Sequence, residues 1–215
     1  MRSPKSNSFK KSFKTTMNPF KNIGAILLKS AVICVIISGC TMFETRSPEE
    51  PSGSSVPFQQ PTSKDIVISN FKNAIAQRSE YNFIACFDTS GYYFEPSADA
   101  RQNFTNMWTL DDERRSFVAL VSKISPVARF NLLFSNSEFS QPNGTADSVV
   151  YTADYVLRAD HSDSLLISTR ATGTLSFTIA SNRDNGLWFI RRWTDTRSKS
   201  DSAGITWSFL KAYFR

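Results

Sequence analysis

The chain has 215 residues, and its 25 basic and 19 acidic side chains give a formal net charge of +6, a value typical of proteins that bind nucleic acids. Seven of the basic residues and none of the acidic ones precede Cys40, so residues 40–215 carry 18 basic and 19 acidic side chains and a net charge of −1. This distribution excludes a basic nucleic-acid-binding surface, and the three cysteines, of which only Cys86 lies beyond position 40, exclude a disulfide framework.

Residues 1–39 have the layout of a secretory signal peptide. A basic segment is followed by a short apolar run at 31–39, which ends in small residues and is too short to span a bilayer. The junction Ile37-Ser38-Gly39-Cys40 resembles the lipobox of bacterial lipoproteins. In that family the cysteine is acylated by chains such as palmitate and the chain is cut before it. The resemblance therefore implies removal of residues 1–39 and lipidation of Cys40.

The same resemblance implies a location. Thr41 follows the cysteine, where an aspartate would resemble a signal for retention in the inner membrane, so we expect an outer-membrane lipoprotein that faces the periplasm. The alternative is an ordinary signal anchor with a chance cysteine. A start at Met17 in place of Met1 would give the signal peptide a more ordinary length.

Residues 40–62 are expected to form a disordered tether between the lipid and the domain. Four of the nine prolines fall here, with serine, glycine and glutamine and without apolar periodicity. Proline removes backbone hydrogen bonds, and few apolar groups are available to offset the entropy of ordering. The globular domain is accordingly predicted at 63–215.

The first part of this domain is predicted to be helical. Ile68, Phe71 and Ile75 recur at helical spacing after an N-cap at Thr62 or Ser63. A short helix at 79–87 and an extended segment at 92–96 follow. Thr109 to Asp112 resembles a capping box and opens a helix that ends before the proline at position 126.

From position 130 the apolar period becomes two, which is typical of strands with one buried and one wet face. Three such strands are predicted at 130–135, 149–158 and 165–179, separated by segments rich in turn-forming residues. A fourth, at 187–193, is apolar on both sides and is expected to be central or covered by the carboxyl-terminal segment 206–214.

The predicted class is α+β, with N-terminal helices packed on a curved antiparallel meander sheet. The order of elements over about 64–197 resembles the nuclear transport factor 2-like, or SnoaL-like, cone. The run from Trp188 to Asp195 also looks like the closing strand of lipoproteins with this fold. The resemblance implies a cone-shaped pocket between sheet and helices. A small β-barrel is the alternative, although it would need about eight strands and little helix before them.

Individual residues give little support for catalysis. His161, the only histidine, lies in Asp160-His161-Ser162-Asp163, which is predicted to be a solvated hairpin tip rather than part of a triad. Asp154 is expected on the wet face of its strand, and Cys86 is read as a small buried hydrophobe. Asp88 and Glu95 are read as turn or rim carboxylates, with the catalytic base of an isomerase of this fold as the alternative. No spacing indicates a metal site, a phosphate loop or a cofactor.

The candidate pocket residues are Tyr151, Tyr155, Arg191 and Trp193. The tyrosines lie on an apolar stripe and their hydroxyl groups would need partners, while Arg191 is predicted to share the inner face of its strand with Trp193. Such a group would hold a small apolar or anionic ligand. The alternative is an ordinary aromatic core with Arg191 reaching solvent.

Three functions remain open at this point. The first is a non-catalytic, membrane-anchored envelope lipoprotein that binds a ligand or an envelope protein. The second is a small-molecule enzyme of the isomerase or dehydratase type that uses the cone pocket. The third is a filled cone that acts through its surface.

Overall fold

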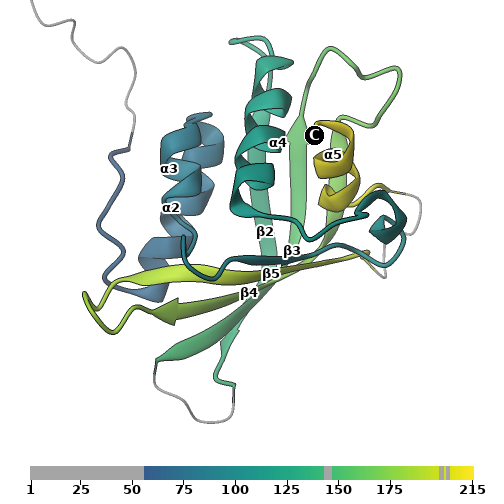
Figure 1. Cartoon of the computed structure of the whole chain (residues 1–215). Coiled ribbons are helices and arrows are strands. Elements are labelled where there is room, and N and C mark those ends of the chain that lie inside the picture. Colours follow the sequence, from purple (N-terminus) through teal and green to yellow (C-terminus); the bar gives the residue numbers. More distant parts are fainter. Residues whose placement is uncertain (1–55, 143–146, 199–200, 202–203) are drawn as a thin grey trace, which may run out of the picture. The chain divides into compact units, whose positions relative to one another are not determined.

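The computed structural model describes residues 56–142, 147–198, 201 and 204–215 (Figure 1). The predicted signal peptide, Cys40 and residues 41–55 of the predicted tether lie outside this part. The elements follow in the order α2 (Lys64–Ala76), α3 (Glu80–Ile84), β1 (Tyr93–Glu95), the 3₁₀ turn η2 (Arg101–Asn103), α4 (Leu110–Ser122), β2 (Phe130–Ser140), β3 (Ser148–Ala159), β4 (Arg170–Ser181), β5 (Trp188–Thr196) and α5 (Trp207–Tyr213).

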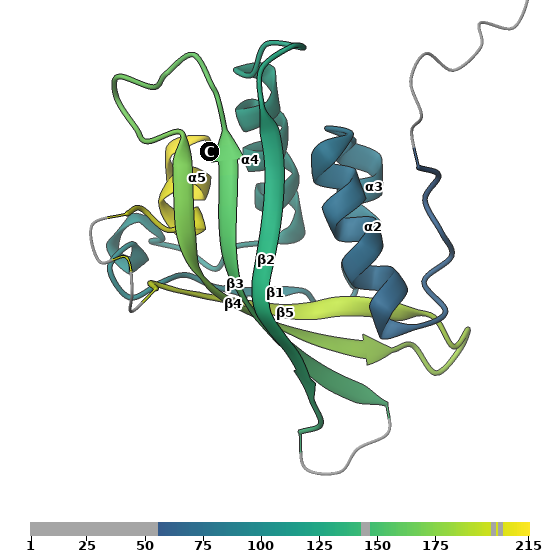
Figure 2. The same ribbon diagram turned by 180° about the vertical axis from the view of Figure 1, so that it is seen from behind.

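The strands form one curved, open sheet in the order β1-β5-β4-β3-β2 (Figures 1 and 2). Strands β2 to β5 make the predicted antiparallel meander, and the short β1 pairs parallel to β5 at one edge. The sheet is therefore mixed. Its two edge strands do not meet, so the predicted α+β cone is confirmed and the β-barrel alternative is wrong.

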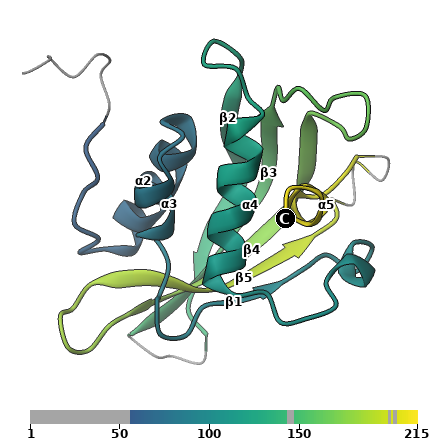
Figure 3. The same cartoon turned by 45° about the horizontal axis from the view of Figure 1, so that its top comes forward.

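The helices begin where local capping chemistry predicts. Ser63 caps α2, its side chain accepting a hydrogen bond from the backbone amide of Ile66. Thr109 and Asp112 form the complete capping box of α4, each side chain bonding the backbone of the other. Helices α2, α4 and α5 pack on one face of the sheet (Figure 3).

The interior of the cone is filled by aromatic side chains. Phe71 of α2 lies at the centre, with its ring centroid 5.1 Å from that of Phe177 and 5.7 Å from that of Trp193. Trp207 of α5 closes the same cluster, 4.7 Å from Trp193 in an edge-to-face arrangement. All four rings are buried, which gives the domain a continuous aromatic core.

Two predicted boundaries shift. Residues 56–62, which the sequence assigns to the tether, lie against the domain: Asn70 exchanges two hydrogen bonds with the backbone of Gln59, and the amide of Trp188 donates to the carbonyl of Pro61 over 2.8 Å. The strand predicted from Leu165 begins only at Arg170. Residues 162–167 form a turn instead, because backbone hydrogen bonds within this segment replace the strand-to-strand hydrogen bonds of a sheet.

Within the described residues, no helix has the length and apolarity that a membrane crossing needs.

Candidate functional site

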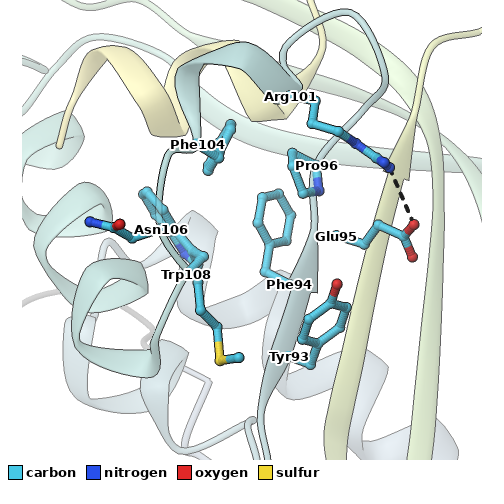
Figure 4. Close-up of a pocket in the computed structure, with 9 residues that line it drawn as sticks. Tyr93, Phe94, Glu95, Pro96, Arg101, Phe104, Asn106 and Trp108 are labelled. Carbon is cyan, nitrogen blue, oxygen red and sulfur yellow. Dashed lines mark hydrogen bonds and ion pairs between the residues drawn. The ribbon is translucent and has the colours of Figure 1, made fainter.

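A pocket with a volume of about 280 Å³ opens beside β1, where the chain runs through η2 toward the start of α4 (Figure 4). Its walls come from one continuous stretch of the chain. The lining residues are Tyr93, Phe94, Glu95, Pro96, Arg101, Phe104, Asn106, Met107 and Trp108.

Aromatic rings form the inner wall of this pocket. The ring of Phe104 lies 5.6 Å from that of Phe94 and 5.1 Å from that of Trp108, measured between centroids. Phe94 and Trp108 are buried, whereas Met107 at the rim is 75% exposed. An exposed methionine beside packed rings provides an adaptable apolar contact for a flat molecule.

Charged groups lie at the mouth of the pocket. Glu95 forms ion pairs with Arg192 and with Arg101, the latter over 3.4 Å. The hydrogen bond from Arg192 and the positive charges of both guanidinium groups hold the pKa of Glu95 below its ordinary value. The side chain of Arg101 is 63% exposed and its contact is long, so its guanidinium is available to an incoming anion.

A buried ion pair lies directly beneath the aromatic wall. The ammonium of Lys211 on α5 donates to Oε2 of Glu113 on α4 over 2.7 Å, and both side chains are 2% exposed. The Tyr92 hydroxyl and the Trp108 indole N–H each donate to the same oxygen over 2.8 Å. The ammonium also lies 3.6 Å from the ring centroid of Phe94, a cation–π contact that joins the pair to the pocket wall.

Burial sets the electrostatics of this pair. Desolvation lowers the pKa of Lys211 to about 8, against an ordinary value of 10.5, although the negative charge of Glu113 opposes the shift. Burial and the nearby carboxylate raise the pKa of Tyr92 well above its ordinary value. The tyrosine therefore stays protonated and acts as a hydrogen-bond donor, so one oxygen of Glu113 accepts from three donors.

A second buried carboxylate, Asp195 on β5, lies deeper in the cone. It accepts hydrogen bonds from the Tyr155 hydroxyl at 2.8 Å and from the Ser208 hydroxyl at 2.5 Å. The backbone amide of Trp207 in turn donates to the Tyr155 hydroxyl over 2.7 Å. Burial raises the pKa of Asp195 despite these donors. Because α5 supplies two of the contacts, it ties the end of the chain into the cone interior.

The structure brings three of the four predicted pocket residues together. Tyr151, Tyr155 and Trp193 are all buried in the core. Arg191 is not among them: its side chain is 48% exposed, and its Nε donates to Asp88 over 2.8 Å. Its predicted place on the inner face is wrong.

The cause is an irregularity in the pairing of β4 with β5. Thr178 lies opposite Arg192 and the next residue of β4 lies opposite Ile190, so Arg191 is an extra residue in its strand. The bulge leaves both arginines outside while Ile190 and Trp193 point inward.

The prediction of a solvated His161 is also wrong. Its side chain is 4% exposed, and its ring packs edge-on against Phe214 with 5.1 Å between centroids. Nε2 lies 3.4 Å from the carbonyl oxygen of Ser168. The turn after β3 folds back over the end of α4, and Ile124 pairs with His161 in an isolated bridge.

Cys86 and Asp154, which the sequence assigns to structural roles, have structural contacts. Cys86 is 2% exposed, and burial raises the pKa of its thiol far above the ordinary value. Asp154 accepts hydrogen bonds from Thr174 at 2.6 Å and from Asn136 at 2.9 Å.

Glu113, Lys211 and Asp195 were not among the site residues predicted from the sequence. Signals for all three exist in the sequence. Glu113 begins the stripe that continues four residues later at Phe117, and Lys211 falls within the apolar spacing of the last helix. Asp195 stands two residues after Trp193, on the inner face of its strand. Charged residues on apolar faces mark buried, paired groups.

One other hollow is less suited to an anionic ligand. It has a volume of about 740 Å³, lies near the β4–β5 turn and has mostly polar walls. Its arginines already have carboxylate partners, Arg183 with Asp147 and Arg191 with Asp88.

No protein family and no curated protein matches the sequence. Solved structures of similar shape include a nuclear transport factor 2-like protein from Cytophaga hutchinsonii, with 12% identity over 63% of this chain and 98% of that chain and a TM-score of 0.47. Another, of unknown function, comes from Shewanella oneidensis, with 8% identity over 60% of this chain and 93% of that chain and a TM-score of 0.38. A third is a proposed dehydratase of the nuclear transport factor 2-like family from Streptomyces avermitilis, with 7% identity over 62% of this chain and 92% of that chain and a TM-score of 0.44. These likenesses leave the function to be argued from the site.

Proposed function

We propose that the protein is a lipid-anchored binding module of the cell envelope, and that its ligands are small planar apolar compounds that carry an anionic group. The observation that carries this proposal is the pocket beside β1, in which an aromatic wall and an exposed arginine lie side by side (Figure 4). The proposed role is binding rather than catalysis.

The aromatic wall favours a flat ligand. A volume of about 280 Å³ is near the lower limit of small-molecule sites and accommodates one or two fused rings. Contacts with Phe104 and Trp108 would each add about 0.5–1.5 kcal/mol beyond simple area burial. The buried pair Glu113–Lys211 fixes the indole of Trp108 from behind, which reduces the ordering that binding requires.

The charge at the mouth favours an anion. Glu95 keeps Arg192 as a partner if Arg101 turns away, so a ligand carboxylate can take the place of Glu95 on Arg101 without leaving a charge unpaired. Arginine and carboxylate also match as a bidentate hydrogen-bonded pair.

The proposal of a lipid anchor is based on the amino-acid sequence. The lipobox resemblance at Cys40 supports attachment to the outer membrane on its periplasmic side, and an envelope protein remains a second kind of partner for the exposed surface.

A second candidate function is catalysis of the isomerase or dehydratase type. Asp195 and Tyr155 favour it, because a carboxylate of raised pKa lies within hydrogen-bond distance of a tyrosine inside the cone. Ser208 and Tyr155 already occupy its oxygens, and α5 covers it. A substrate would therefore have to displace α5.

Isothermal titration with 2-naphthoate and with the uncharged 2-naphthylmethanol tests the binding site. We expect Phe104→Ala to weaken both probes about tenfold, and Arg101→Gln to weaken only the naphthoate. Tyr81→Ala, at a side chain that is 81% exposed and outside the pocket, is the control. Absence of binding by either probe, or binding that Phe104→Ala leaves unchanged, refutes the assignment.

Membrane fractionation of Cys40→Ser tests the anchor. Two or more acyl chains hold a protein firmly to a bilayer, so the wild type should stay in the membrane fraction after a high-salt wash. The variant should be released or remain unprocessed. A variant that is processed and retained like the wild type would refute the lipid anchor.

A further inference from the structure

Three large apolar side chains protrude at one end of the domain. Leu165 is 99% exposed, Leu166 is 77% exposed, and Val127 is 95% exposed. The two leucines stand in the turn between β3 and β4, and the valine follows the end of α4. Figure 1 shows both segments at the same end of the domain.

Hydrogen bonds connect these two segments and hold them in shape. The amide of Ser162 donates to the carbonyl of Lys123 over 2.9 Å, and the amides of Leu166 and Ile167 both donate to the carbonyl of Asp163. The buried His161 ring supports the turn from beneath. The leucines are therefore presented by an ordered turn, and their exposure needs another explanation.

The described chain begins at this same end. Gln77, after the last residue of α2, donates from its side chain to the carbonyl of Val56 over 2.6 Å. The next residue, Arg78, donates to the carbonyls of Ser125 and Ala128, which flank Val127. A short chain of contacts thus joins the start of the described part to the apolar tips.

We propose that this end, formed by Val127, Leu165 and Leu166, rests on the surface of an anionic lipid bilayer with the three apolar side chains in its interface. The inference deepens the proposed anchor and rests on it for the orientation. Cys40 and Val56 are sixteen residues apart, and a flexible coil of that length spans about 20–24 Å. Strand β4, with twelve residues, extends about 40 Å from this end to the other. The predicted tether therefore favours contact through the near end.

The charge of this end suits anionic lipids better than a neutral surface. Five basic side chains here are Arg78, Lys123, Arg129, Arg158 and Arg170, and three acidic groups, Asp160, Asp163 and Asp201, pair with four of them. Asp160 is shared by Arg129 and Arg158, and Arg78 donates to backbone carbonyls, so this group has a positive excess of two charges. Such an excess attracts anionic headgroups, and apolar tips beside it are the usual companion at a membrane interface.

The test places an environment-sensitive nitrobenzoxadiazole label at Leu166→Cys in full-length protein that also carries Cys34→Ser and Cys40→Ser. Cys86 is buried and does not compete for the label. The vesicles contain phosphatidylcholine and phosphatidylglycerol at about 3:1, with a fraction of brominated lipid as quencher. The control is Asp184→Cys, an exposed residue in the turn between β4 and β5, at the opposite end of β4 and outside the pocket beside β1.

We expect a several-fold rise in label emission and strong quenching by brominated lipid at position 166, weaker effects on vesicles of phosphatidylcholine alone, and little change at position 184. Equal behaviour at the two positions overturns the proposal. Since the label reports its own surroundings whatever holds the chain to the vesicle, this result is independent of lipidation. If Cys40→Ser is processed and retained in membranes like the wild type while the label at position 166 is quenched, the lipid anchor is refuted and the membrane contact of this end is supported.

Discussion

Replacing Lys211 by methionine isolates the buried ion pair behind the pocket. The change removes the ammonium and keeps most of the aliphatic stem, while Glu113 stays buried with the Tyr92 hydroxyl and the Trp108 indole as donors. A carboxylate that has lost its cation in a buried site is the costly product of this substitution.

The magnitude follows from that burial. Both side chains of the pair are 2% exposed, so solvent does not compensate the lost charge, and the expected loss of stability is about 3–5 kcal/mol. For a domain of this size a loss of about 3 kcal/mol lowers the melting temperature by roughly 6–12 °C. The double variant Lys211→Met/Glu113→Gln should be less destabilised than the sum of its single variants by at least about 2 kcal/mol.

Urea unfolding followed by tryptophan fluorescence and by circular dichroism measures these values, with coincident transitions as the check on two-state behaviour. Arg114→Met is the control, because its contact with Glu80 joins two side chains that are 51% and 47% exposed. That variant should stay within about 0.5 kcal/mol of the wild type. Additive losses in the double variant would refute the coupling between Glu113 and Lys211.

Three further predictions concern the same core. Desolvation lowers the pKa of Lys211 to about 8, against an ordinary value of 10.5. Between these pH values the unfolded chain holds a proton on Lys211 that the folded chain has lost, so the stability of the wild type relative to Lys211→Met should rise with pH. A flat or falling difference in urea unfolding would contradict the desolvation of Lys211. Phe177→Ala should cost about 3–5 kcal/mol in urea unfolding, while Thr178→Ala on the other face of β4 stays within about 0.5 kcal/mol, and equal losses would mean that the strand register is wrong. His161→Ala should cost about 1–3 kcal/mol through its lost packing on Phe214, and a change below 0.5 kcal/mol would favour the solvated turn after all.

The sequence was sufficient for the fold because local signals and burial agree. The cap at Ser63, the capping box at Thr109 and the period-two stripes each specify an element and its buried face together. Once four strands must form a meander and three helices must cover one face of it, few arrangements remain.

The site was less predictable because two of its features are not periodic. One extra residue in β5 places Arg191 on the outer face of the sheet instead of the inner face, and no pattern in the sequence marks that bulge. The turn after β3 buries His161 through contacts with Ile124, which follows α4, and Phe214, which follows α5, and both are distant in the chain. The pocket beside β1 lies in an irregular stretch, where neither helical nor strand spacing assigns a direction to side chains.

A crystal structure of the protein with 2-naphthoate would locate the proposed binding site. We expect the fused rings against Phe104 and Trp108 and the carboxylate on Arg101, with Lys211 and α5 unmoved. A ligand found instead inside the cone against Asp195 and Tyr155, with α5 displaced, would contradict this expectation and favour the enzymatic alternative.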